Sequence, residues 1–176
     1  MVITGASSGI GKAIALEMAH DPYEFYLIGR NRSRLSMVAD TIRNRGVTVE
    51  IGVGDLQDAA INFRLYQQAM DRFGKIDILV ANAGVGYFGP LETMTEDQYD
   101  AQFDTNVKAV FLWLKYVLPQ MKARHAGQIL VTSSNLGLHV AGRASLYAAT
   151  KHAVQAMIAS LRKELAGTGV KAATIN

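Results

Sequence analysis

Three closely spaced glycines near the start of the chain constrain its fold more than any other feature. They lie in the segment Thr4–Gly11, which reads TGASSGIG. The apolar residues Met1–Ile3 come directly before it, as expected for a buried strand of a parallel sheet. After it, apolar residues recur at helical spacing, at Ile10, Ala13, Ile14 and Met18. The sequence therefore predicts a strand, a tight glycine turn and the start of a helix in direct succession.

A turn of this kind is suited to bind phosphate groups. Glycines lack side chains, so the backbone can turn sharply and a ligand can approach it closely. The free N–H groups of the first helical turn, together with the helix dipole, then favour a diphosphate. A purely structural loop is the alternative, because the G-x3-G-x-G spacing differs from the commoner G-x-G-x-x-G of dinucleotide-binding turns.

Six short apolar runs of strand character alternate with helical patterns along the chain. They cover Val2–Thr4, Phe25–Ile28, Thr48–Val53, Ile76–Ala81, Gln128–Thr132 and Val170–Ile175. Such alternation is typical of an α/β protein in which helices cover both faces of a parallel sheet through right-handed crossovers. In the doubly wound nucleotide-binding (Rossmann) fold, which we expect here, the strand order is 3-2-1-4-5-6.

The composition limits which classes of protein the chain can belong to. Its 176 residues are 49% hydrophobic and 19% charged, which is enough apolar material for one globular domain, residues 1–176, with a sizeable core. The chain has no cysteine, which excludes disulfides and thiolate metal sites and suits a cytoplasmic location, and we expect no bound metal. No apolar run is long enough to span a membrane, and a net charge of +3 is too small to indicate nucleic-acid binding.

The end of the second predicted strand bears on which dinucleotide the turn would bind. It lies about 20 residues after the glycine turn, where an acidic residue would hold the adenosine ribose hydroxyls of NAD. Gly29 stands at that position and Arg30 follows it. Without the carboxylate nothing repels a 2′-phosphate, and a guanidinium fork suits phosphate oxygens, so we expect NADP(H). The alternative is that Arg30 and Arg32 are solvated residues at the start of a helix.

Candidate catalytic residues follow the fifth predicted strand. Ser134 comes directly after it, and Tyr147-Ala-Ala-Thr-Lys151 lies at the start of the next helical pattern. Residues four apart share a helix face, so Tyr147 and Lys151 can approach the same ligand. By itself this pair is a weak signal, and two solvated side chains would be the default. With the glycine turn, the Asn82-Ala-Gly84 motif and Asn106, in this order, the whole chain resembles the short-chain dehydrogenase/reductase family.

The resemblance implies reversible hydride transfer between a nicotinamide and a carbonyl or alcohol substrate. Tyr147 would be the general acid in reduction, Ser134 would polarise the substrate oxygen, and Asn106 would hold a proton-relaying water. Lys151 would bind the nicotinamide ribose and stabilise the ionised phenol. Bringing a tyrosine from pKa about 10 to near 7 takes about 4 kcal/mol, and one ammonium about 4 Å away offers about 4 kcal/mol at an effective dielectric near 20. From the residues alone, Asn106 could equally be a structural hydrogen-bonding residue.

The resemblance also implies which residues contact the cofactor. In the glycine turn they are Gly5, Ser7, Ser8, Gly9, Ile10 and Gly11, joined elsewhere by Arg30, Tyr147 and Lys151. Asp55 would reach the adenine amino group with Leu56 against the ring, although Asp55 could equally cap the following helix. Asn82 and Gly84 would serve as framework and cofactor contacts. In the loop after them, Tyr87 and Phe88 either line the substrate pocket or are ordinary packing residues.

A long apolar segment suggests a subunit interface. Helical spacing predicts a core-facing stripe at Val107, Val110, Phe111, Leu114, Val117 and Leu118. Further large apolar groups lie on another face, at Leu112, Trp113 and Tyr116. A helix that is apolar nearly all round is buried on more than one side, so we expect a homodimer or homotetramer. Pro119 is expected to kink or end this helix.

The most favoured function is an NADPH-dependent reductase of a small or medium ketone or aldehyde. A 3-oxoacyl-thioester reductase of fatty-acid synthesis is the nearest alternative among enzymes. A non-catalytic dinucleotide sensor is the alternative from another class, although a pure binder has no use for all four of Ser134, Tyr147, Lys151 and Asn106. The family's last strand and substrate-covering segment are missing after Asn176, so we expect these residues to belong to a longer chain and do not predict the substrate's identity.

Overall fold

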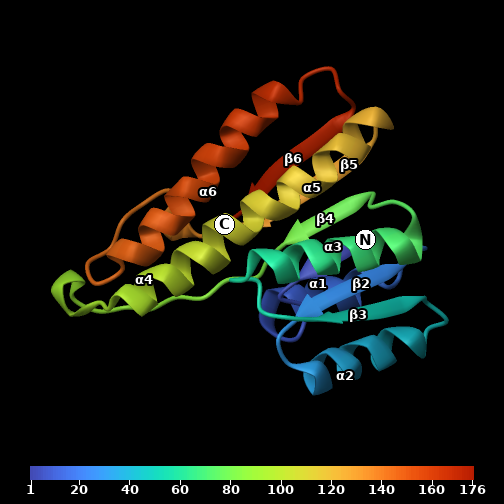
Figure 1. The fold of residues 1–176 in the computed structure, drawn as a ribbon, viewed down its shortest axis with the longest axis horizontal. Helices are drawn as coiled ribbons and strands as arrows, with labels where there is room; N and C mark the ends of the chain where they lie inside the picture. The colour runs from blue at the N-terminus through green and yellow to red at the C-terminus, as the bar shows by residue number, and fades with distance from the viewer.

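The chain folds around a parallel sheet of six strands. The computed structural model describes residues 1–176, and its strand order is β3-β2-β1-β4-β5-β6, which confirms the predicted order (Figure 1). The strands are β1 (Val2–Thr4), β2 (Phe25–Gly29), β3 (Val49–Val53), β4 (Ile78–Ala81), β5 (Gly127–Thr132) and β6 (Val170–Ile175). All neighbouring strands pair in parallel, so their carboxyl ends meet at one edge of the sheet.

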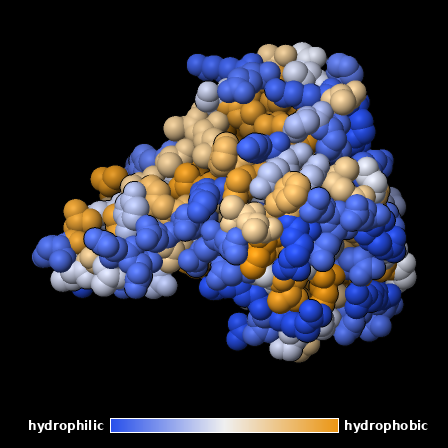
Figure 2. Space-filling model, viewed as in Figure 1, coloured by the Kyte–Doolittle hydropathy of each residue, from blue (hydrophilic) through white to orange (hydrophobic).

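Helices cover both faces of the sheet, as predicted. The helices are α1 (Gly9–Met18), α2 (Arg32–Arg43), α3 (Ala59–Phe73), α4 (Glu96–Phe103), α5 (Ala109–Ala123) and α6 (Ser145–Glu164). Residues of α1 and α2 share one buried core with the sheet, and residues of α3, α5 and α6 share a second, larger core. In Figure 2, hydrophobic residues reach the visible surface mainly in the region of α5 and α6. No helix has both the length and the apolar character needed to cross a membrane.

Polar side chains fix where several helices begin. The Asn31 side chain accepts a hydrogen bond from the Arg34 N–H at the start of α2, and Asp58 accepts one from Ala60 at the start of α3. Thr95 and Gln98 form a reciprocal capping box at the start of α4, with Thr95 in the position that its sequence context indicates. These caps satisfy N–H groups that the first helical turn leaves without partners.

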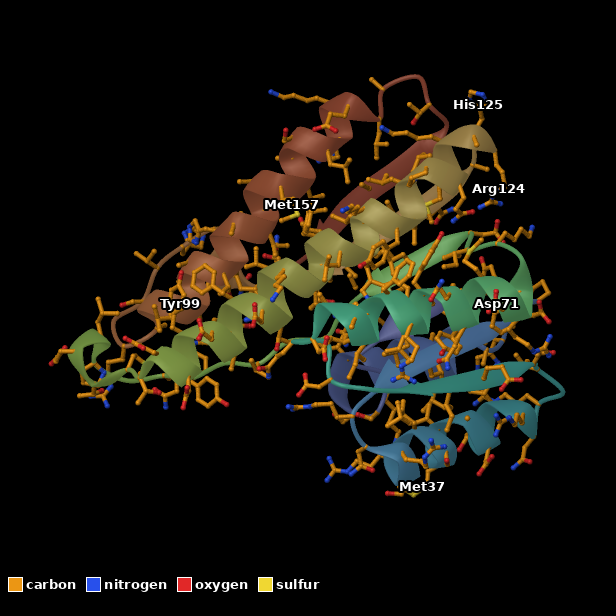
Figure 3. The ribbon with its side chains drawn as sticks, in the orientation of Figure 1. Met37, Asp71, Tyr99, Arg124, His125 and Met157 are labelled. Atoms are coloured by element: carbon orange, nitrogen blue, oxygen red, sulfur yellow. The ribbon has the colours of Figure 1, made fainter.

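Side chains hold the segment before β4 at the amino-terminal edge of the sheet. Arg124, at the end of α5, donates hydrogen bonds to Asp77 and to the Ile76 carbonyl, which also accepts one from Gln120. Figure 3 shows Arg124 at this edge, away from the arrow tips of the strands. β4 begins at Ile78, whereas the apolar run had predicted a strand from Ile76, and the Ile76 carbonyl accepts hydrogen bonds from side chains instead.

Helix α5 differs from its prediction in which side faces the core. Phe111, expected in the buried stripe, is 49% exposed, whereas Trp113, expected on another face, is 1% exposed and packs edge-on against Tyr66. A helix that is apolar nearly all round carries more than one plausible stripe, so its periodicity could not decide between them. Pro119 does not end the helix, which continues to Ala123 and buries Met121 completely.

Replacing the buried aromatic of α5 should destabilise the protein far more than replacing the exposed one. Trp113→Ala removes a fully packed ring and should lower the free energy of unfolding by about 3–5 kcal/mol. Phe111→Ala on the same helix should cost about 1 kcal/mol or less, because half of the ring already contacts solvent. Urea unfolding of both variants measures the difference, and equal losses would contradict the assigned orientation of α5.

Candidate active site

A cavity of about 920 Å³ lies along the carboxyl edge of the sheet. It is bordered by the segments that follow β1, β2, β3, β4 and β5, which is where open parallel sheets bind their ligands. Of the residues singled out from the sequence, it brings together Gly5, Ser7, Ser8, Gly9, Ile10, Arg30, Asp55, Leu56, Asn82, Gly84, Ser134, Tyr147 and Lys151. Gly11 and Asn106 lie behind this wall and do not line the cavity.

The glycine turn leads directly into α1 and presents bare backbone to the cavity. Gly9 has a φ of 54°, and no atom lies within 4 Å of where its side chain would begin, so the space beside it is open. Gly11 has the opposite constraint, because a side chain there would clash with the Gly5 carbonyl and the Asn82 amide. Ser8 precedes the helix without capping it, so no side chain caps the N–H groups of the first turn. This arrangement suits a diphosphate.

Asn82 joins three strands at the cavity floor. Its amide nitrogen donates to the Thr4 carbonyl over 3.2 Å, and its amide oxygen accepts a hydrogen bond from the Thr132 hydroxyl over 3.0 Å. The Thr4 hydroxyl in turn accepts hydrogen bonds from the backbone N–H groups of Asn82 and Ala83. The residue therefore ties the ends of β1, β4 and β5 together while one side of it borders the cavity.

Two arginines stand at one end of the cavity. Arg30 lies 3.9 Å from Asp55, and Arg34, in the first turn of α2, also lines the wall. Arg32 does not line it. Asp55 accepts a hydrogen bond from the Gln57 N–H and does not cap α3, because Asp58 occupies the capping position. The capping alternative for Asp55 was therefore wrong.

Ser134, Tyr147 and Lys151 line another part of the same cavity. Lys151 is only 4% exposed, its Nζ donates a hydrogen bond of 2.8 Å to the Thr132 carbonyl, and the same nitrogen lies 5.6 Å from the centre of the Tyr147 ring. Burial lowers the pKa of Lys151 from 10.5 to about 8. The Ser134 hydroxyl accepts a hydrogen bond from the Leu136 N–H, which leaves its own proton free to be donated.

Asn106 is buried, and protein groups occupy its whole side chain. Its amide oxygen accepts a hydrogen bond from the Val85 N–H, and its amide nitrogen donates to the Val85 carbonyl and to the Thr150 hydroxyl. It lies in a π-helical segment, Asp104–Lys108, between α4 and α5. The side chain thus fits the structural alternative, because it holds the loop after β4 against α6.

The cavity wall also contains residues that the sequence analysis did not single out, including Arg34, Thr105 and Thr132. The sequence could have indicated Arg34, because it lies only four residues after Arg30, in the first turn of the next helix. Thr132 is the last residue of the fifth predicted strand, directly before the serine pair. Thr105 precedes Asn106, and its buried hydroxyl has no hydrogen-bond partner. No local signal marks Thr105, because its exposure to the cavity depends on the π-helical segment.

The buried charge of Lys151 should make stability depend on pH. Between pH 8 and 10.5 the folded protein has lost this proton and the unfolded chain still holds it, so stability should rise with pH. In Lys151→Met this contribution is absent. The stability difference between variant and wild type, measured by urea unfolding, should therefore change by about 2–3 kcal/mol between pH 7 and pH 10 in favour of the wild type. A difference that stays constant across this range would contradict the lowered pKa.

Comparison with known proteins yields close matches across the chain. An uncharacterised oxidoreductase of Listeria monocytogenes is 36% identical over 177 residues, which cover 99% of this chain and 71% of that protein. A ketoacyl reductase of a monensin polyketide synthase from Streptomyces virginiae is 35% identical over 171 residues, covering 96% and 66%. The crystal structure of a metagenomic short-chain oxidoreductase in complex with NADP superimposes with a TM-score of 0.95 at 33% identity, covering 98% of this chain and 79% of that one.

The family model for short-chain dehydrogenases supplies the broadest match. It aligns with residues 1–176, which is the whole chain. The relatives and the solved structure described above agree with it over nearly the same residues. The chain therefore belongs to the short-chain dehydrogenase/reductase family.

Proposed function

We propose that this protein is an NADPH-dependent oxidoreductase that reversibly reduces a ketone or aldehyde. One observation carries the proposal: a single cavity is lined both by a glycine turn suited to a diphosphate and by Ser134, Tyr147 and Lys151. Binding a dinucleotide alone would require only the first of these features. A phenol, a hydroxyl and a buried ammonium that border the same space are the groups needed to move a proton to or from a carbonyl oxygen.

The residues present fit a nicotinamide dinucleotide phosphate. The open space beside Gly9 and the N–H groups of α1 would hold the diphosphate. Arg30 and Arg34 would hold a 2′-phosphate, and no carboxylate follows β2 directly to repel it. When bound, the dinucleotide supplies the hydride in reduction and accepts it in oxidation. The NADP complex of the similar metagenomic oxidoreductase supports this choice of cofactor.

In the proposed reduction, Tyr147 donates its phenolic proton to the substrate oxygen as negative charge develops there. Ser134 donates a hydrogen bond to the same oxygen and stabilises that charge. Lys151 stabilises the phenolate that remains, because its ammonium lies 5.6 Å from the ring and the Thr132 carbonyl holds it in place. Burial from water strengthens this attraction. In oxidation the same groups work in reverse, with Tyr147 as the base.

Asn106 has a positioning role in this proposal. Its side chain hydrogen-bonds to Val85 and Thr150 and so joins the loop after β4 to α6. The expectation that Asn106 holds a proton-relaying water stays a prediction.

A 3-oxoacyl-thioester reductase is the second candidate. The likeness to a ketoacyl reductase of a polyketide synthase favours it, because that relative is 35% identical over most of this chain. Both candidates use the same proton-donating residues and differ only in the group attached to the carbonyl. Measuring NADPH consumption with acetoacetyl thioesters beside simple ketones and aldehydes distinguishes them. NADPH binding without turnover of any carbonyl would instead favour the dinucleotide sensor.

Removing the phenolic hydroxyl should abolish turnover without loss of cofactor binding. Tyr147→Phe deletes the proton donor and should lower kcat by about 10²–10⁴-fold, while the Kd for NADPH stays within about twofold of wild type. Tyr99→Phe is a matched control, because Tyr99 is exposed on α4 and does not line the cavity. Steady-state assays measure kcat, and fluorescence titration measures the Kd for NADPH. Near-normal turnover by Tyr147→Phe would overturn its assigned role.

Cofactor preference should depend on the arginines of the cavity wall. The wild type should have a higher kcat/KM with NADPH than with NADH. Arg30→Ala should lower kcat/KM for NADPH about tenfold or more, since a charge-assisted hydrogen bond contributes about 1.5–3 kcal/mol, and should leave NADH use almost unchanged. Arg32→Ala, outside the cavity, is the control. A wild-type preference for NADH would refute the choice of NADP(H).

Other expectations from the sequence stay predictions. They are a homodimer or homotetramer, a cytoplasmic location and a single domain over residues 1–176. The exposed half of Phe111 on α5 supports an oligomer, because a large apolar side chain there would gain from contact with a second subunit.

A further inference from the structure

The loop after β4, residues Val85–Pro90, is anchored to the rest of the protein by hydrogen bonds along its length. Asn106 holds both the N–H and the carbonyl of Val85, at 2.9 and 2.8 Å. The fully buried Gln102 accepts a hydrogen bond from the Tyr87 N–H, and the Arg143 carbonyl accepts one from the Gly89 N–H over 2.8 Å. The loop is therefore anchored at its beginning, middle and end, to three different segments of the chain.

This loop places one aromatic ring against the proposed proton donor. The Phe88 ring centre lies 5.2 Å from that of Tyr147, with the two planes inclined by 48°. Gly86 makes the approach possible, because a side chain there would come within 3.0 Å of both rings. Tyr87, although it is the neighbouring residue and also exposed, does not line the cavity.

Phe88 is nevertheless not a core residue. It is 60% exposed and borders the cavity beside Tyr147. An aromatic ring held on a fixed loop and left largely in solvent gains free energy when an apolar group covers it. The loop Val85–Pro90 has no charged residue, so nothing on it offers an ion pair to a charged substrate.

Further apolar residues lie exposed on the neighbouring loop. Leu138 and Val140 belong to the segment before α6, which the hydrogen bond from Gly89 to the Arg143 carbonyl joins to the Phe88 loop. Figure 1 shows the two loops together at the left end of the molecule, and Figure 2 shows hydrophobic residues on the surface at this end. Leu138 and Val140 do not line the cavity, but the segment that carries them is joined to the loop that does.

We propose that Phe88 determines substrate specificity, and that the substrates are ketones or aldehydes with an aryl or comparably flat apolar group near the carbonyl. The inference rests on the proposed function, in which Tyr147 donates a proton to the carbonyl oxygen. The Phe88 ring centre lies 5.2 Å from that of Tyr147, so a substituent on a carbonyl that is hydrogen-bonded to the Tyr147 hydroxyl can reach the Phe88 ring. A flat apolar substituent packs against that ring in the offset or edge-to-face arrangement that aromatic pairs prefer.

The experiment compares two ketones that differ only in a phenyl group, 4-phenyl-2-butanone and 2-butanone, with NADPH in excess. Phe88→Ala should lower kcat/KM for 4-phenyl-2-butanone about tenfold, which corresponds to about 1.4 kcal/mol, mainly by raising KM. It should change kcat/KM for 2-butanone by less than about twofold. Phe88→Trp should keep the preference for the phenyl ketone, and Tyr87→Ala should alter neither ketone.

The possible outcomes separate this inference from the proposed function. If Phe88→Ala lowers activity equally on both ketones, or on neither, Phe88 does not determine specificity, although carbonyl reduction itself stands. A wild type that prefers 2-butanone overturns the inference in the same way. A wild type that binds NADPH but reduces no carbonyl compound overturns the proposed function and the inference with it. Melting temperatures of all variants should match the wild type, because both exchanged side chains are exposed.

Discussion

The hydrogen bonds of Asn82 are the constraint on which the rest of the site depends. Parallel strands end with polar backbone groups that no further strand satisfies, and in this protein one amide side chain connects three such ends. The glycine turn rests directly on that amide, since Gly11 approaches it too closely for any side chain. The glycine turn and the segments that carry Ser134 and Tyr147 thereby line one cavity along the carboxyl edge of the sheet. The activity proposed for this short-chain dehydrogenase requires the glycine turn and these side chains to keep their positions relative to one another.

The sequence was sufficient for those features that depend on local spacing. The alternation of apolar runs with helical patterns predicted the parallel sheet, the expected doubly wound fold predicted its strand order, and the strand bounds agreed to within two residues. The glycine turn and the Tyr147–Lys151 pair also lie where their spacing indicates, because a turn and one face of a helix are defined within a few residues. Ser134 could be joined to them only through the family resemblance, since its distance along the chain from the glycine turn gives no geometry.

Features that depend on packing between distant segments could not be predicted from the sequence. Trp113 and Phe111 are both compatible with a buried stripe, and only the position of α3 beside α5 determines which of them is enclosed. Asp55 and Asp58 are both acceptable caps by composition, and the backbone entering α3 selects Asp58. The sequence could not decide whether Phe88 lines the pocket or is an ordinary packing residue, because its contact with Tyr147 joins a loop and a helix that lie far apart in the chain.

The three hydrogen bonds of Asn106 also affect how the site can move. Its side chain hydrogen-bonds to Val85 and to the Thr150 hydroxyl of α6. The Thr150 hydroxyl in turn donates a hydrogen bond to the Tyr147 carbonyl within the same helical turn. Loop and helix are therefore joined by buried hydrogen bonds, which hold Phe88 beside Tyr147. Movement of the loop away from α6 would first have to break these buried hydrogen bonds, and α6 is itself tied to β5 because Lys151 donates a hydrogen bond to the Thr132 carbonyl.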